Sequence, residues 1–243
     1  MRNRIQMIKI MEVQRSHSIV LLLICMILIG FSWMGAGAKP QFTAMYVFGD
    51  SLSDPGNNLY FYVTATKSNY FPYGIDFSDG PTGRFCNGKI IVDFLAELVG
   101  LPLLPPYKNP NTTGKNILFG VNYASAAAGI LDESGINFGH RIPLSEQIQN
   151  FNNTVNQLRN QMEEEEMSQY LENALVFMAI GSNDYSNNYL MPQIYRSSQL
   201  YSPEDFADLL INQYASYIQV WATSTLLLGR RVRVRHASWH VEH

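Results

Sequence analysis

A serine and an asparagine with the chemistry of acyl transfer each follow an apolar run of the chain. Ser51 stands in "FGDSLSDPGNN", residues 48–58, and Asn183 stands in "GSND", directly after the apolar run 175–180. A serine hydroxyl attacks an ester when a base takes its proton, and N–H groups must face the oxyanion that develops. Ser51 is therefore a candidate nucleophile, and the side-chain amide of Asn183 is a candidate oxyanion donor.

These side chains are positioned by strands and helices that alternate along the chain. Apolar runs predict strands, and apolar stripes at three- and four-residue steps predict helices. The predicted strands are 44–48, 117–124 and 175–180, and the predicted helices cover 90–98, begin at Leu144, and begin at the cap-like "SPED" of 202–205.

Alternating strands and helices indicate a parallel α/β sheet, in which sites lie beyond the carboxyl ends of the strands. The continuous run "LVFMAI", 175–180, is typical of a strand buried on both faces. Ser51, the segment Ser125–Ala126 and Asn183 should then meet at one edge of the sheet. We expect the backbone N–H groups of Ser51 and Ala126 to join the Asn183 amide as oxyanion donors.

Composition bounds the class of protein. The chain has 243 residues, of which 47% are hydrophobic and 15% charged, with a net charge of −3. This is enough apolar material for one core, and nothing in the charge favours a nucleic-acid partner. The acidic run Glu163–Glu166 is interpreted as a solvated helix face or loop, because four adjacent residues cannot converge on one metal ion. We therefore expect no cofactor and no metal.

The first 38 residues have the layout of a secretory signal peptide. A basic leader precedes the apolar run 19–31, and the small residues 36–38 follow it. The alternative is a membrane anchor, but thirteen apolar residues fall short of the ~20 that a spanning helix needs. Cleavage would remove Cys25 and leave Cys86 as the single cysteine of the exported chain. Two Asn-x-Thr sequons, at Asn111 and Asn152, are candidate glycosylation sites.

Four blocks of the chain resemble the plant GDSL esterase/lipase family, within the SGNH hydrolases. They are "FGDSLSDPGNN" at 48–58, "GRFCNGKIIVDFLAELVGLP" at 83–102, "GVNYASAAAGIL" at 120–131 and "FMAIGSNDY" at 177–185. The resemblance covers residues 44 to about 229. It implies a flavodoxin-like three-layer α/β/α sandwich and a secreted, extracellular hydrolase of the apoplast or cell wall. The implied substrates are small-molecule or lipid esters, including esters of the cell wall and of secondary metabolites.

The resemblance also implies roles for single residues. Ser51 corresponds to the nucleophile, Asn183 to the oxyanion asparagine, and Ala126 to an oxyanion position where many relatives carry glycine in "ASGGAG". Alanine keeps the backbone N–H, although its Cβ costs energy if φ is positive. Gly120 and Gly129 match glycines of the family that serve the backbone rather than the chemistry.

The family's Asp-x-x-His block, which supplies acid and base, occurs nowhere in this sequence. His140, in "NFGHRIPL", does not match that base. The tail 230–243 is basic and departs from the family. Its histidines (His236, His240, His243) have a spacing that suggests a metal site, but an altered splice or reading frame explains the tail better.

The domain assignment is therefore a signal peptide at 1–38, the N-terminal part of a hydrolase domain at 39–229, and an atypical tail. The sheet is expected to be incomplete at its C-terminal strands. The chain is expected to be an inactive or weakly active esterase. The alternative is a non-catalytic ester- or glycan-binding protein of the same fold. No stable membrane anchor is expected after cleavage of the leader.

Overall fold

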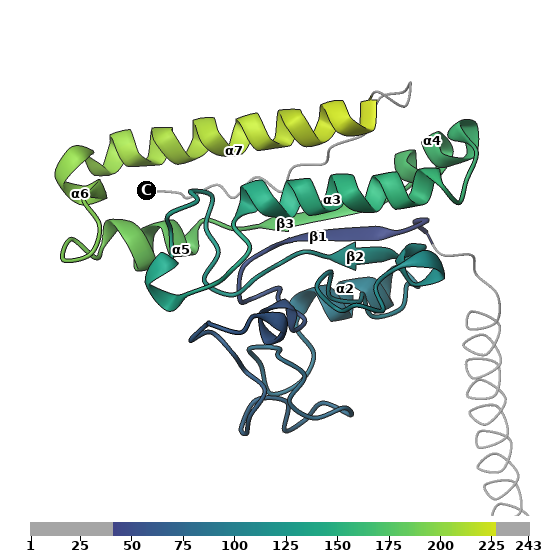
Figure 1. Ribbon diagram of the computed structural model, residues 1–243, viewed down its shortest axis with the longest axis horizontal. Coiled ribbons are helices and arrows are strands. Elements are labelled where there is room, and N and C mark those ends of the chain that lie inside the picture. The colour runs from purple at the N-terminus through teal and green to yellow at the C-terminus, as the bar shows by residue number, and fades with distance from the viewer. Residues whose placement is uncertain (1–40, 227–243) are drawn as a thin grey trace, which may run out of the picture. The chain divides into compact units, whose positions relative to one another are not determined.

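The computed structural model describes residues 41–226 (Figure 1). The predicted signal peptide and the basic tail with its three histidines lie outside the described residues, so those predictions stay as they are. Within residues 41–226, no helix has both the length and the hydropathy needed to cross a membrane.

A parallel sheet forms the centre of the described region. Its strands are β1 (Met45–Gly49), β2 (Gly120–Asn122) and β3 (Leu175–Ala179), in the order β2-β1-β3. Met45 of β1 lies opposite Gly120 on one side and Leu175 on the other. The predicted parallel α/β sheet is therefore confirmed, with β1 at its middle.

Helices and helical turns connect the strands. They are η1 (Asn57–Tyr60), α2 (Ile91–Leu98), η2 (Gly114–Ile117), η3 (Ile136–Phe138), α3 (Leu144–Arg159), α4 (Glu164–Glu172), α5 (Ser182–Asp184), the π-helical η4 (Tyr185–Tyr189), α6 (Ser197–Leu200) and α7 (Pro203–Leu226). The glutamates of the acidic run are exposed, and three of them form the first turn of α4, where negative charge favours the helix.

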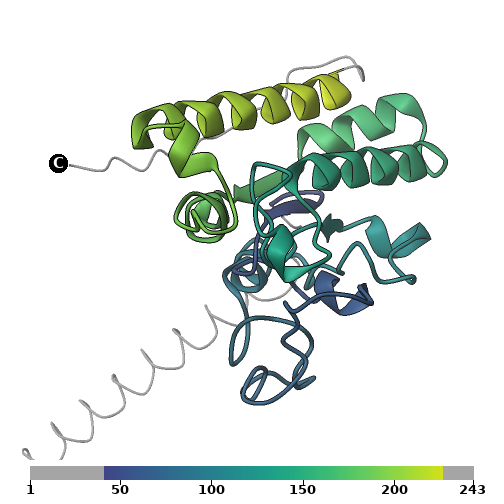
Figure 2. The same ribbon diagram turned by 60° about the vertical axis from the view of Figure 1, so that its left-hand side comes forward.

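Two apolar clusters cover the two faces of the sheet, because successive side chains of β1 point to opposite sides. Tyr46 and Phe48 join the cluster that includes α3 and α7, whereas Met45 and Val47 join the cluster that includes α2. Figures 1 and 2 show α7 (yellow-green) and α3 (teal) on the same side of the sheet. The described region therefore has the expected three layers.

The predicted helical stripes are the buried faces of the helices. In α3, the stripe residues Leu144, Ile148, Phe151, Val155 and Leu158 are buried. At the start of α7, the hydroxyl of Ser202 accepts a hydrogen bond from the N–H of Asp205 at 3.1 Å, which confirms the predicted cap.

Two strand predictions differ from the structure. The predicted strand 117–124 shrinks to three residues, because Ile117 belongs to the 3₁₀ turn η2. Gly120 has φ +109°, and a Cβ there would lie 1.8 Å from the Met45 carbonyl oxygen. Strand β3 is partly exposed instead of buried on both faces, and it lies at one edge of the sheet that the described residues form.

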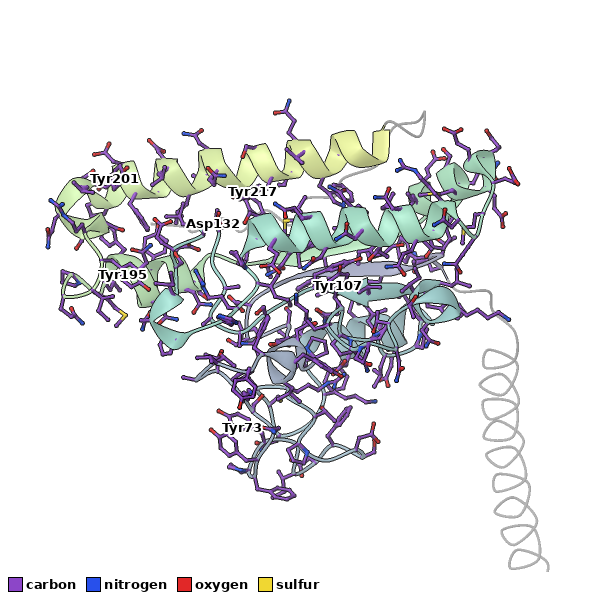
Figure 3. The ribbon with its side chains drawn as sticks, viewed as in Figure 1. Tyr73, Tyr107, Asp132, Tyr195, Tyr201 and Tyr217 are labelled. Atoms are coloured by element: carbon purple, nitrogen blue, oxygen red, sulfur yellow. The ribbon has the colours of Figure 1, made fainter. Side chains whose placement is uncertain are left out.

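The long connection between η1 and α2 contains the aromatic residue Tyr73 (Figure 3). Its ring contacts Tyr70 and Phe85 at centroid distances of 5.4 and 5.6 Å. Earlier in this connection, Thr64 forms an isolated antiparallel bridge with Gly139. The connection is therefore tied to the segment that precedes α3.

Candidate active site

Ser51 lies in the turn that directly follows β1. The backbone N–H of Ser53 donates to the carbonyl of Asp50 at 3.1 Å, which closes the turn. The Asp50 carboxylate accepts from the Leu52 N–H at 3.1 Å and from the Ser182 hydroxyl at 2.9 Å. Ser51 itself is partly exposed, and neither its hydroxyl nor its N–H is hydrogen-bonded to any residue in 41–226. The turn thus presents a serine whose hydroxyl and N–H have no hydrogen-bond partner within the described residues.

The three predicted strand ends meet at one edge of the sheet. The Ser125 N–H donates to the carbonyl of Gly49 at the end of β1, at 3.1 Å. Ser182, beyond β3, reaches Asp50 beyond β1. The Asn183 side-chain amide donates to the carbonyl of Ala128 at 2.9 Å. The sequence-based expectation that these segments converge is confirmed by these three hydrogen bonds.

The segment after β2 makes a tight turn over residues 125–128. The Ala128 N–H donates to the Ser125 carbonyl at 3.1 Å. The Ala126 N–H donates to Asp54 Oδ2 at 3.0 Å, so this predicted oxyanion donor already has a partner. Ala127 has φ +65°, and its N–H donates to no described residue. The backbone strain therefore falls one residue later than the sequence comparison anticipated.

Ala127 was missed by sequence reasoning, although a signal was present. The chain has three consecutive alanines, 126–128, where the resemblance to the family implies a glycine pair. A glycine at the second position of that pair supplies the positive φ that the turn demands, and alanine adopts it at a cost. The buried N–H of Ala127 is the free backbone donor of this turn.

Asp54 is a fully buried carboxylate behind the nucleophile turn. Its Oδ1 accepts from the N–H groups of Gly56 and Asn57 at 2.7 and 2.6 Å, and its Oδ2 accepts from Ala126. Burial raises the pKa of Asp54 to about 6, and the backbone donors limit that rise. Asp54 therefore ties the Ser51 loop to the 125–128 turn.

Two asparagines that follow Asp54 add further hydrogen bonds between the Ser51 loop and the segment after β2. The Asn57 amide donates to the carbonyls of Asn122 and Ala124 at 2.9 and 2.8 Å. The Asn58 amide donates to the Ala126 carbonyl at 3.0 Å. The "GNN" of the first block thus fixes the path of the chain after β2, a role that sequence reasoning did not assign.

Asn183 is buried next to a buried carboxylate, that of Asp184. Asp184 accepts hydrogen bonds from the N–H groups of Ile130 and Leu131, at 2.8 and 2.9 Å, and from the Ser134 hydroxyl at 2.7 Å. Burial raises the pKa of Asp184. A Cβ on Gly129 would lie 2.6 Å from Asp184 Oδ1, so this position requires glycine. Asp184 holds the loop that carries Ala128, the partner of Asn183.

His140 is the only histidine among residues 41–226, and it lies away from the Ser51 turn. Its side chain is exposed, and its ring meets that of Phe61 edge to face at 6.0 Å. The backbone N–H of His140 donates to the carbonyl of Val63. No contact joins His140 to Ser51, so the described residues supply no histidine base to the serine.

The sequence is similar to known proteins over most of its length. The family profile described as GDSL-like Lipase/Acylhydrolase matches residues 45–236. GDSL esterase/lipase 7 of Arabidopsis thaliana is 51% identical over 203 residues, which cover 81% of this chain and 55% of the relative. GDSL esterase/lipase At1g71250 of the same plant is 53% identical over 172 residues, covering 71% and 46%. The chain spans about half the length of these curated relatives.

Proposed function

The chain belongs to the GDSL-like lipase/acylhydrolase family, and we propose that its site acts on carboxylic esters with Ser51 as the nucleophile. One observation supports this most directly. Ser51 stands just beyond the central strand, in a turn held by Asp50, with a hydroxyl that no described residue engages. A serine in such a turn can meet a substrate without first breaking a hydrogen bond.

The proposed reaction begins when Ser51 Oγ attacks the ester carbonyl and its proton passes to a base. The carbonyl oxygen becomes an oxyanion, which needs N–H donors. The Ser51 N–H is free, and the Asn183 amide keeps a second hydrogen after its bond to Ala128. Ala126 would have to exchange Asp54 for the oxyanion. We therefore propose the free N–H of Ala127 as a further donor.

The rate proposed for this chain is low. No Asp-x-x-His block occurs within these 243 residues, so in a chain of this sequence we propose that water or buffer takes the proton of Ser51. Loss of a member of the catalytic triad from a serine hydrolase lowers kcat by about 10⁴–10⁶-fold. The donors around Ser51 would still favour the tetrahedral intermediate. The same absence favours the alternative function, which is ester or glycan binding without turnover.

We also propose that the chain is exported and acts outside the cell, on lipid or cell-wall esters. The basic leader and apolar run of residues 1–38 support export through the secretory route. Two sequons in the part that follows are compatible with that route.

The proposal is tested by hydrolysis of a short p-nitrophenyl ester with added imidazole as an external base. We expect the wild-type chain to exceed the Ser51→Ala variant, and the difference to grow with imidazole concentration, because imidazole supplies the missing base. Ser216→Ala, which changes an exposed serine of α7, is the matched control and should behave as wild type. Equal rates for wild type and Ser51→Ala at every imidazole concentration would refute the esterase and leave the binding protein.

A further inference from the structure

The two sequons of the chain occupy very different structural environments. Asn111 lies in a surface turn that precedes η2, whereas Asn152 lies in the middle of α3. From this contrast we infer that Asn111 carries the N-linked glycan of the exported chain and that Asn152 carries none. The inference rests on the proposed export and goes beyond it, because it decides between the two sites.

The Asn111 sequon is open to solvent. The Asn111 side chain is exposed, and its carboxamide group takes part in no hydrogen bond among the described residues, where only the backbone N–H donates. The turn is held by the Thr112 N–H, which donates to the Asn109 carbonyl at 2.8 Å, and by the Asn111 backbone N–H, which donates to the Asn109 side chain at 3.0 Å. Gly114, the residue after the sequon, has nothing within 4 Å of the position of a Cβ. A bulky sugar on Asn111 therefore has space, and the turn does not depend on its amide.

The hydroxyl of the Asn111 sequon is also accessible. Thr113 is exposed, and its hydroxyl donates only to the partly exposed Gln157, at 3.2 Å. Acceptor sequons lie on surface loops in exported proteins, and this one has that position.

The Asn152 sequon is closed by the fold. Its threonine, Thr154, is 1% exposed, and the hydroxyl accepts from Tyr123 at 2.8 Å and donates to the carbonyl of Asn150. The Asn152 side chain is partly exposed, and its carboxamide oxygen is buried. The middle residue, Asn153, donates to the hydroxyl of Tyr107, which is labelled in Figure 3.

The native packing of α3 therefore removes the Asn152 sequon as an acceptor. Transfer to Asn152 requires access to the sequon hydroxyl, and the folded chain buries that hydroxyl of Thr154 against Tyr123. The hydroxyl of Thr113 stays accessible in the folded chain, so only the Asn111 sequon remains open.

The modification is a group transfer from a lipid-pyrophosphate-linked oligosaccharide. Nδ2 of Asn111 forms a bond to the anomeric carbon of the sugar and loses one proton. The bond from that carbon to the pyrophosphate oxygen breaks, and its electron pair leaves with the lipid pyrophosphate. The sum is neutral in redox terms, and no residue of this chain is a catalyst.

The test is translation of the full chain in the presence of endoplasmic-reticulum microsomes, followed by glycosidase treatment and peptide mass analysis. We expect one glycan, absent in Asn111→Gln and retained in the matched control Asn152→Gln. Thr113→Ala should abolish the glycan and Thr113→Ser should restore it, because serine keeps the hydroxyl.

Protection from added protease separates this inference from the proposed export. A protected chain that carries sugar at Asn152, or carries none, would overturn the inference and leave export intact. A chain that added protease digests completely would refute export and the inference together.

Discussion

The Asp184 carboxylate offers the sharpest test of how the site is held together. It receives two buried backbone N–H groups, of Ile130 and Leu131, and the hydroxyl of Ser134. Replacing Asp184 by alanine removes the acceptor while the donors stay buried, since Ile130 and Leu131 are 6% and 9% exposed. The expected result is a large loss of stability.

The size of this stability loss follows from the two backbone N–H groups, which are fixed in place and cannot reach another acceptor. A buried N–H without a partner costs about 1–3 kcal/mol, so two of them cost about 2–6 kcal/mol, with a midpoint of about 4. Asp184→Asn keeps one acceptor oxygen and points an NH₂ group at the other donor, so its expected cost is about 1–3 kcal/mol. With a urea m value of about 2 kcal/mol/M, the alanine variant should lose about 2 M in midpoint.

The assay is urea unfolding of the full chain, followed by far-ultraviolet circular dichroism. The matched control is Asp208→Asn, which changes an exposed aspartate of α7 and should shift stability by less than about 0.5 kcal/mol. The expected order of stability is control, Asp184→Asn, Asp184→Ala. An Asp184→Asn protein more stable than wild type would refute the reasoning, because it would show that desolvation of the carboxylate outweighs its three hydrogen bonds.

Three further predictions follow from other buried groups. Burial raises the pKa of Asp54 from 3.8 to about 6, so the folded state binds this proton more tightly than the unfolded state does. The stability of the wild-type protein relative to Asp54→Asn should therefore fall by up to about 3 kcal/mol as pH rises from about 4 to 6. A relative stability that increases over this range would contradict the prediction. Arg84→Met removes the ion-pair partner of the buried Asp93, at 2.7 Å, and should lower the free energy of unfolding in urea by about 3–5 kcal/mol. Adding Asp93→Leu should recover most of that loss. Equal stability of the single and double variants would contradict the pairing. Gly120→Ala should yield insoluble protein, whereas Gly80→Ala, also at positive φ but in open space, should cost only about 1 kcal/mol; equal yields would contradict the contact with β1.

The sequence was sufficient for the three strands, for the helices α2, α3 and α7, and for their order along the chain. The stripe Leu144 to Leu158 repeats at the helical period, and α3 buries that stripe. The apolar run that begins at Leu175 became β3, parallel to β1. These predictions succeeded because periodicity and composition act locally, within one or two turns of helix or one strand. Convergence of the segments that follow β1 and β3, which Asp50 and Ser182 join, followed from the parallel topology alone.

The partners of buried polar groups were decided by the tertiary structure. Asp54 and Ala126 are 72 residues apart in sequence, yet their hydrogen bond leaves Ala127, not Ala126, with the free N–H of the turn. Nothing local distinguishes these two alanines. The difference arises because a buried carboxylate must find donors, and only the packed chain determines which donors lie within reach. In the same way the two sequons share one motif, and only burial of Thr154 in the folded chain separates Asn152 from Asn111.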